Sequence, residues 1–159
     1  MKDLEKEVRK ILRKKTWLVL STVDDQNQTH SSVVVYQSDG NVLYVSTGKN
    51  TLKVNNIKRN NKVSIAIPFR KNFFHKLIPA PPAELHFIGK AELVPRDDEY
   101  ARKIFAKFLK YDQEADLSEE SIWIKITPSN IISTYGVGVS LFTMRKPEKA
   151  RNLVHLSLK

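Results

Sequence analysis

Apolar and polar residues alternate along most of the chain, and this pattern predicts β-strands. Residues 16–23 (TWLVLSTV) and 29–36 (THSSVVVY) are rich in β-branched and aromatic residues, and a polar turn separates them. Asp39-Gly40 separates the second run from 42–47 (VLYVST), and Asp-Gly favours a tight turn in which both central residues have positive φ. We therefore expect three consecutive antiparallel strands.

The same alternation predicts more strands in the rest of the chain. They are expected at 62–68, ending at Pro68, at 84–94 with a bulge at Gly89, at 121–127, and within 131–143, where Gly136 and Gly138 allow a bend. The basic tail that follows has no predicted element.

Helical spacing of apolar residues occurs in three segments. Asp3 can cap a first, amphipathic helix that would act as a short lid, and Asn50 or Thr51 can begin a second helix that runs to Arg59 and ends at Asn60-Asn61. Asp97 can cap a third. The apolar faces expected for the first and third helices are Leu4, Val8, Ile11 and Leu12, and Tyr100, Ile104, Phe105, Phe108 and Leu109. An acidic turn is expected at 116–120.

The order of these elements predicts a mainly β (α+β) fold. Six or seven mainly antiparallel strands joined by hairpins, with two or three flanking helices, form a closed or nearly closed β-barrel most simply, because closure removes exposed strand edges. We find no internal repeat and no break in composition, so residues 1–159 are expected to form a single domain. Residues 69–83 contain three prolines and no periodicity, and their aromatic and basic side chains suggest a loop that borders a site.

Composition and charge narrow the class of partner. The chain has no cysteine, which excludes disulfides, thiolate metal sites and a cysteine nucleophile, and suits the cytoplasm. It has no apolar run long enough to cross a bilayer and no signal-peptide core, so we expect a soluble protein with no membrane partner. Of the formal net charge of +10, residues 1–80 carry +9, with 15 Lys and Arg against six Asp and Glu. An anion is the natural partner, although a basic surface that only aids solubility fits too.

The segment YVSTGKNTLK, residues 44–53, is the most informative for chemistry. It places a strand end, a glycine turn and a helix start in succession, so that hydroxyls, free backbone N–H groups and ammonium groups gather around one point. The residues concerned are Ser46, Thr47, Gly48, Lys49, Asn50, Thr51 and Lys53. A phosphate group fits such a point, and the alternative is an ordinary helix cap whose lysines face water.

Several common motifs are absent from the sequence. It contains no phosphate-binding G-x-x-x-x-G-K-[ST], no H-E-x-x-H and no G-x-S-x-G. The four histidines, His30, His75, His86 and His155, lack ligand-like spacing, so no metal site is expected.

Taken together, residues 16–68 resemble the flavin-binding split-barrel family that includes pyridoxamine 5'-phosphate oxidase. The shared order is strand, polar turn, strand, Asp-Gly turn, strand ending in Ser or Thr, Ser/Thr-x-Lys at a helix start, and an Asn-rich turn. Thr51-Leu52-Lys53 stands at the Ser/Thr-x-Lys position, and Asn60-Asn61-Lys62 at the usual Asn-Pro-Arg/Lys turn. Residues 84–143 resemble the second half of the family more weakly. The resemblance implies a six- to seven-stranded antiparallel split β-barrel.

The resemblance also implies FMN as the cofactor, bound between the two subunits of a homodimer. Lys53 and Thr51 would hold the phosphate with Ser46 and Thr47, assisted by Lys49. Residues Ser31, Ser32 and Val33 would run along the isoalloxazine edge, although Ser32 stands where many members have a basic residue. The loop at 69–83, with Trp123 or Tyr135, could close the cleft from the partner subunit, whereas barrel core is the simpler interpretation of Trp123.

The function expected from this resemblance is that of an FMN-dependent oxidoreductase, which passes hydride or electrons through flavin N5 to or from a small substrate. No catalytic residue is assigned, because the protein mainly positions the cofactor. The C-terminal TMRKPEKARNLVHLSLK lacks the Trp and Arg signature of a true pyridoxamine-phosphate oxidase. Three alternatives stay open. One is a relative that binds a deazaflavin or heme, and another is a non-catalytic, basic nucleic-acid-binding barrel that uses Phe69, Phe73 and Phe74. The third is a flavin carrier or sensor without turnover.

Overall fold

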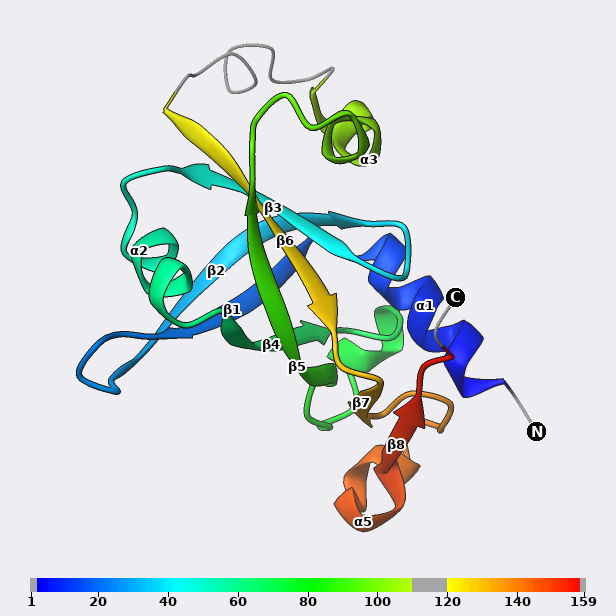
Figure 1. The fold of residues 1–159 in the computed structure, drawn as a ribbon. Helices are drawn as coiled ribbons and strands as arrows, with labels where there is room; N and C mark the ends of the chain where they lie inside the picture. Colours follow the sequence, from blue (N-terminus) through cyan, green and yellow to red (C-terminus); the bar gives the residue numbers. More distant parts are fainter. Residues whose placement is uncertain (1–2, 110–119, 158–159) are drawn as a thin grey trace.

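The computed structural model describes residues 3–109 and 120–157 (Figure 1). The strands in these residues are β1 Trp17–Val23, β2 Thr29–Ser38, β3 Leu43–Gly48, β4 Lys62–Phe69, β5 Ala83–Val94, β6 Ser121–Pro128, β7 Ile131–Tyr135 and β8 Arg151–His155. The helices are α1 Leu4–Lys14, α2 Leu52–Arg59, α3 Glu99–Leu109 and α5 Pro147–Ala150, with 3₁₀ turns at Phe73–Lys76 and Thr143–Arg145. The expected acidic turn lies mostly outside the described residues.

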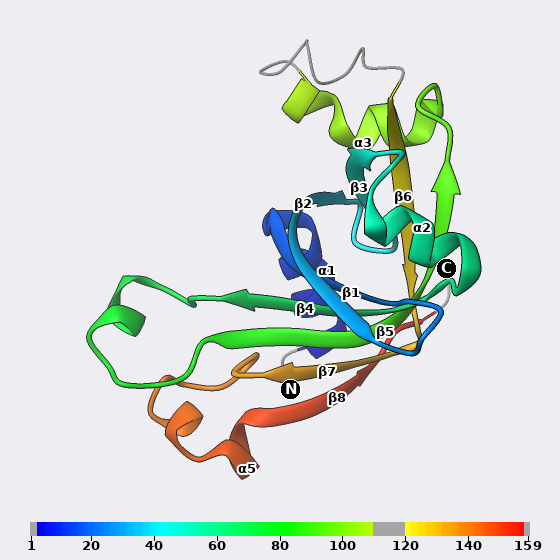
Figure 2. The ribbon, with the colours of Figure 1, turned by 90° about the vertical axis from the view of Figure 1, so that its left-hand side faces the viewer.

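Six of the strands close an antiparallel barrel. The sheet order β4-β1-β2-β3-β6-β5 returns to its start because β5 also pairs with β4. Strands β7 and β8 extend the sheet from β5, and Figure 2 shows them beside it, with β4 and β5 running together into the protruding segment that joins them. The predicted mainly β, antiparallel split barrel is therefore confirmed, with six strands in the barrel and two more outside it.

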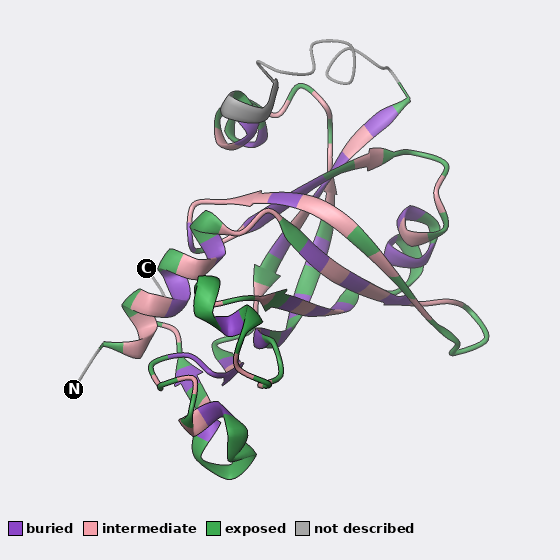
Figure 3. Ribbon diagram, turned by 180° about the vertical axis from the view of Figure 1, so that it is seen from behind, coloured by how far each residue is buried: buried purple, intermediate pink, exposed green. Residues whose placement is uncertain are grey.

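The alternation seen in the sequence places every second side chain inside the barrel. In β1, Leu18 and Leu20 are buried, whereas their neighbours are partly exposed. The same holds in β4 and β5, whereas β3 and β6 also bury outward-facing residues, Tyr44 and Trp123, against α3. The largest buried side chains of the main core include Tyr36, Leu43, Ile65, Ile67, Leu85, Ile124 and Ile126. Figure 3 shows this alternation of buried and exposed residues along the strands.

Helix α1 covers one end of the barrel, as its apolar stripe predicts. Asp3 caps it by accepting the Lys6 backbone N–H at 3.2 Å, and Val8 and Leu12 are fully buried. Arg9, also buried, donates to the carbonyls of Gly40 (3.1 Å) and Ser157 (2.7 Å). The helix therefore joins the β2–β3 turn to the C-terminal segment.

The Asp39-Gly40 turn differs from the prediction of positive φ at both residues. Only Gly40 has a positive φ, at 95°. The Asp39 carboxylate closes the turn instead, because it accepts the backbone N–H groups of Asn41 (2.7 Å) and Val42 (3.0 Å). The side chain therefore replaces the backbone geometry of a two-residue hairpin.

The prediction of a bulge at Gly89 is also wrong. Strand β5 keeps a continuous register there, with Gly89 opposite Val63 on one edge and Pro128 on the other. An added Cβ would lie 3.0 Å from Ile126 Cγ2 and 3.0 Å from the Thr127 carbonyl oxygen. Glycine is needed here for close packing, where β5 changes from pairing with β4 to pairing with β6.

Two predictions for the second half of the chain need correction. Asp98, rather than Asp97, caps α3, because its carboxylate accepts the Ala101 N–H at 2.7 Å. Tyr100 is largely exposed instead of lying on the apolar face, and the side chains of Phe108 and Leu109 lie outside the described residues. The strand expected within 131–143 ends at Tyr135, since Gly136 and Gly138 both have φ of 74°. The tail forms β8, which the sequence did not predict.

The contacts of α1 predict an acid-sensitive fold. Glu5 accepts hydrogen bonds from the Arg9 guanidinium and from the backbone and hydroxyl of Ser157, and these lower its pKa to about 2. Because this value lies below the usual 4.5, the ionised Glu5 stabilises the fold above about pH 4.5, and the stabilisation is lost as the pH falls toward 2. We expect Glu5→Gln to lower the urea midpoint of unfolding at pH 7, with a difference from wild type that shrinks as the pH approaches 2. Glu7→Gln on the same helix is the control, and a difference independent of pH would contradict the assignment.

Candidate functional site

A cleft of about 330 Å³ lies between β2, the end of β1 and the start of α2. Its lining residues are Thr22, Thr29, His30, Ser31, Ser32, Leu52 and Lys53. Figure 1 shows α2 beside the ends of β1 and β2 that form this cleft. The structure therefore brings together Ser31, Ser32 and Lys53 from the residues that the sequence suggested.

Two contacts hold α2 against the barrel at this cleft. Val54 and Ile57 are buried in the main core, which fixes one side of the helix. The side-chain amide of Asn56, also buried, donates to the Thr22 hydroxyl at 3.0 Å and so ties the helix to β1. Lys53 lies in the first turn and is half-buried at the cleft wall.

The N-terminus of α2 lacks a side-chain cap. Thr51 stands at the N-cap, but its hydroxyl donates to the Gly48 carbonyl at 3.1 Å instead of accepting a helix N–H. Within the described part of the chain, the backbone N–H groups of residues 52–54 therefore have no acceptor. The first turn also has no acidic residue. This end of the helix is positive and can accept an anion.

On the opposite wall, the β1–β2 turn positions a histidine that the sequence analysis did not select. His30 Nε2 lies 2.8 Å from Asp24 Oδ2. The other oxygen of Asp24 accepts the backbone N–H groups of Gln26 (2.9 Å) and Gln28 (2.8 Å). The hydrogen bond from His30, followed by those from the backbone, lowers the pKa of Asp24. The Asp-rich turn before a Thr-His strand start was the available signal.

Apart from Thr51 at the start of α2, the other residues expected around the phosphate do not line this cleft. Ser46 accepts a hydrogen bond from Arg96 at 2.9 Å, and Lys49 lines a separate depression that also contains Arg96. Thr47 pairs with Ile122 of β6 and is half-buried. The segment 44–53 is thus divided between two places, because Arg96 holds Ser46 near Lys49, whereas the start of α2 carries Lys53 to the cleft.

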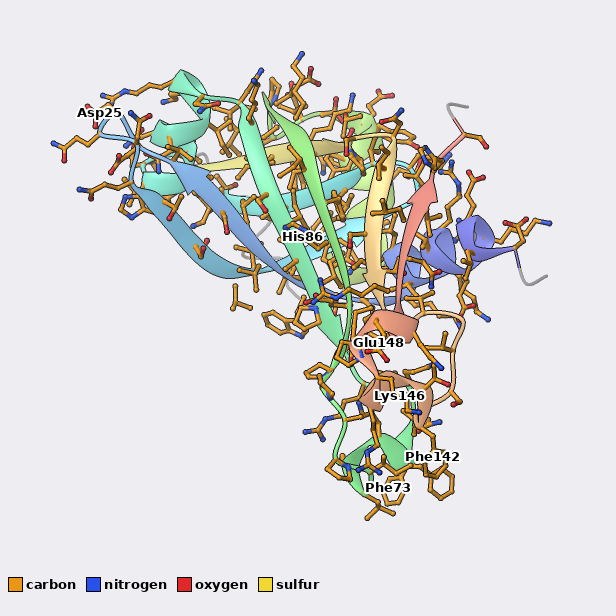
Figure 4. All side chains as sticks on the ribbon, turned by 90° about the horizontal axis from the view of Figure 1, so that it is seen from below. Asp25, Phe73, His86, Phe142, Lys146 and Glu148 are labelled. Atoms are coloured by element: carbon orange, nitrogen blue, oxygen red, sulfur yellow. The ribbon has the colours of Figure 1, made fainter. Side chains whose placement is uncertain are left out.

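Val33 belongs to the outer face of the barrel. It is 67% exposed and stands in a row of paired residues that crosses the sheet, which we call the outer row: Val33, Val19, Ala66, His86, Ser133 and Leu153. Leu153 at the other end of the row is 68% exposed. Figure 4 shows His86 near the middle of the sheet.

The aromatic residues suggested for closing the site are mostly packed within their own chain. Trp123 is fully buried under α3, against Phe105, and Arg96 covers its ring at 3.8 Å. Tyr135 is buried and donates to the Met144 carbonyl. In contrast, the predicted loop at 69–83 exposes Phe73, Phe74 and Leu77, and Figure 4 shows Phe73 and Phe142 at the same protruding end of the molecule.

No group of three or more His, Asp or Glu side chains in residues 3–109 and 120–157 is placed to hold a metal ion. No helix within the same residues is long and apolar enough to cross a membrane.

Solved structures of other proteins share this fold. A candidate pyridoxamine 5'-phosphate oxidase from Listeria innocua is 26% identical, with a TM-score of 0.63, over 79% of this chain and 94% of that chain. General Stress Protein 26 from Bacillus anthracis is 24% identical, with a TM-score of 0.64, over 82% and 92% of the two chains. The heme-storage protein HutZ from Vibrio cholerae is 21% identical, with a TM-score of 0.68, over 85% and 96%.

Two further solved structures share the fold. An F420 reductase is 22% identical, with a TM-score of 0.55, over 76% of this chain and 92% of that chain. An FAD-binding protein from Mesorhizobium loti is 16% identical, with a TM-score of 0.61, over 81% and 91%. No curated protein sequence matches the chain significantly.

The family comparison is more specific than the shared fold. The model of the pyridoxamine 5'-phosphate oxidase family matches residues 4–135, which include the whole six-stranded barrel, α2 and the cleft. The chain therefore belongs to the pyridoxamine 5'-phosphate oxidase family.

Proposed function

We propose that this protein binds FMN and acts as an oxidoreductase on a small substrate. Membership of the pyridoxamine 5'-phosphate oxidase family supports a flavin, as do the F420 reductase and the FAD-binding protein that share the fold. The observation that carries the proposal is the cleft at the start of α2, where a cation, hydroxyls and uncapped backbone N–H groups surround one volume.

The donors of this cleft fit a phosphate monoester. Lys53 supplies an ammonium group, Ser32 a hydroxyl, and the first turn of α2 supplies N–H groups without another acceptor. Each charge-assisted hydrogen bond of this kind contributes about 1.5–3 kcal/mol. Three such bonds would hold the phosphate end of FMN firmly.

The neighbouring part of β2 fits the ring end of the flavin. From Ser31 to Val33 the strand is largely exposed, and Val33 presents an apolar side chain beside Val19 of β1. Bound FMN would supply hydride transfer at its N5 atom. The role of the chain is then to anchor the phosphate, orient the ring along β2 and exclude water from one of its faces.

A homodimer would complete the site. The outer row leaves Val33 and Leu153 exposed, and Trp17 and Ile88 on the same face are 59% and 51% exposed. Apolar side chains gathered on one sheet face are typical of a surface that a partner covers. We infer that a second copy covers it, so that the FMN ring lies between subunits and the exposed loop at 69–83 reaches the partner's cleft.

Lys53→Ala tests the phosphate assignment. We expect FMN to bind at least ten-fold more weakly, because loss of one charged contact costs about 1.4 kcal/mol or more. Quenching of FMN fluorescence during titration gives the dissociation constant. Lys58→Ala, on an exposed position of the same helix, should bind FMN as the wild type does. An unchanged affinity of Lys53→Ala for FMN would show that the phosphate does not bind in this cleft.

Val33→Glu tests the dimer. A charge in the covered apolar face should shift the protein from dimer to monomer at micromolar concentration, because a buried carboxylate would lack a partner. Light scattering after size-exclusion chromatography measures the mass. Ala106→Glu on the exposed side of α3 should leave the dimer intact. A wild-type protein that is itself monomeric would refute the dimer.

Heme is the second candidate, and the position of His86 favours it. This exposed imidazole lies on the outer face beside Ile88, with Nε2 3.2 Å from the Ser64 hydroxyl. An imidazole over an apolar surface can serve as an axial heme ligand, and the similar fold of HutZ supports this choice.

Absorbance of the purified protein separates the candidates. We expect a yellow protein with the two visible-region bands of bound flavin, and a His86→Ala variant that keeps them. A Soret band that disappears in His86→Ala would show that the cofactor is heme instead of FMN. A colourless protein that takes up only a deazaflavin would also overturn the choice of FMN.

A further inference from the structure

His30 and Asp24 form a polar wall of the candidate cleft, opposite the start of α2. His30 lines the cleft, and its Nε2 lies 2.8 Å from the Asp24 carboxylate. Asp24 is fixed in turn by the backbone N–H groups of the β1–β2 turn. The imidazole is therefore held in one orientation by a carboxylate that is itself immobilised.

This arrangement determines which ring nitrogen a ligand can meet. A carboxylate only accepts hydrogen bonds, so His30 Nε2 must carry a proton and donate to Asp24. The Nδ1 atom has no partner among the described residues. In a neutral imidazole Nδ1 would then be a bare acceptor, which repels an anion. In the charged imidazolium it carries a proton and can donate to one.

We propose that His30, oriented by Asp24, supplies the second positive charge of the cleft, so that a phosphate monoester and a proton bind together. The inference rests on the proposed FMN phosphate site. It adds His30 to that site and couples the binding of the phosphate to the binding of a proton. Anion binding favours the imidazolium, and the imidazolium strengthens anion binding.

The surrounding charges agree with this role. Lys53 is the other cation among the lining residues, and Thr22, opposite His30 on β1, is uncharged. The Asp25–Arg59 ion pair, 3.0 Å long, joins the same turn to the end of α2, and both of its side chains are largely exposed. Asp24 is thus the carboxylate that holds His30, and its lowered pKa keeps it ionised throughout the range in which histidines titrate.

The sign of the pH effect follows from the charge of His30. Histidine side chains lose their charge between about pH 5 and 8. A contribution to FMN affinity that depends on a protonated imidazole should therefore decrease as the pH rises. A phosphate monoester itself loses its second proton near pH 6. The comparison must therefore be between wild type and a variant that binds the same ligand without the histidine charge.

His30→Gln provides this comparison, because glutamine can still donate to Asp24 but carries no charge. We expect the variant to bind FMN about ten-fold more weakly than wild type at pH 6, with the ratio falling toward one at pH 8.5. Asp24→Asn should weaken binding in the same direction, because it removes the carboxylate that favours the imidazolium. A ratio that does not change with pH would overturn the proposal.

Calorimetry in two buffers with different ionisation enthalpies gives an independent readout. At pH 7.5 the wild type should take up a substantial fraction of a proton when FMN binds, and His30→Gln should take up none. Lys53→Ala should bind more weakly yet keep the uptake. Riboflavin, which lacks the phosphate, should bind without proton uptake.

These measurements separate two kinds of failure. If FMN does not bind, or if Lys53→Ala has no effect, the proposed phosphate site itself fails. If FMN binds and depends on Lys53, but proton uptake is the same in His30→Gln, then only the role of His30 is refuted.

Discussion

The pairing of β5 with β4 is the constraint on which the rest of the structure depends. Strand β5 pairs with β4 on one edge and then with β6 and β7, so that one long strand both closes the barrel and extends it. Closure gives each of the six barrel strands a partner on both sides, although β2 pairs with β3 only at Tyr36–Ser38. Strand β4 in turn pairs with β1, and β1 with β2, and the ends of these two strands form the cleft. Gly89 permits this closure because Ile126 and Thr127 leave no room for a Cβ.

The chemistry of the cleft depends on a buried hydroxyl, that of Thr22, at the end of β1. Burial of the Thr22 hydroxyl without a hydrogen-bond partner would destabilise the fold, and the side-chain amide of Asn56 donates the hydrogen bond that it needs. That bond brings the start of α2 against β2. Thr51 then bonds to Gly48 and leaves the helix uncapped. A structural requirement inside the barrel therefore produces an anion-binding helix end at its surface.

The sequence predicts the barrel better than the site, for a physical reason. Strand alternation and the apolar stripe of α1 are local patterns, and both were confirmed. The division of 44–53 into two places depends on Arg96, which comes from a distant turn and holds Ser46. The bond between Asp24 and His30 is short-range, yet its importance follows only from the position of α2. Strand β8 was missed because its two apolar residues, Leu153 and Val154, are adjacent instead of alternating with polar ones.

The distribution of positive charge explains why local donors, rather than the net charge of the chain, should select the ligand. The basic residues of the first half lie in separate places. Lys53 lies in the cleft, Lys49 lies beside Arg96, and Lys10 and Arg70 line a depression between α1 and the end of β4, near the opposite end of β1. A nucleic acid strand needs a continuous basic groove with separate stacking platforms. A small phosphate ester needs only one cation, one helix end and one orienting hydroxyl, and the cleft at α2 provides these within a single small volume.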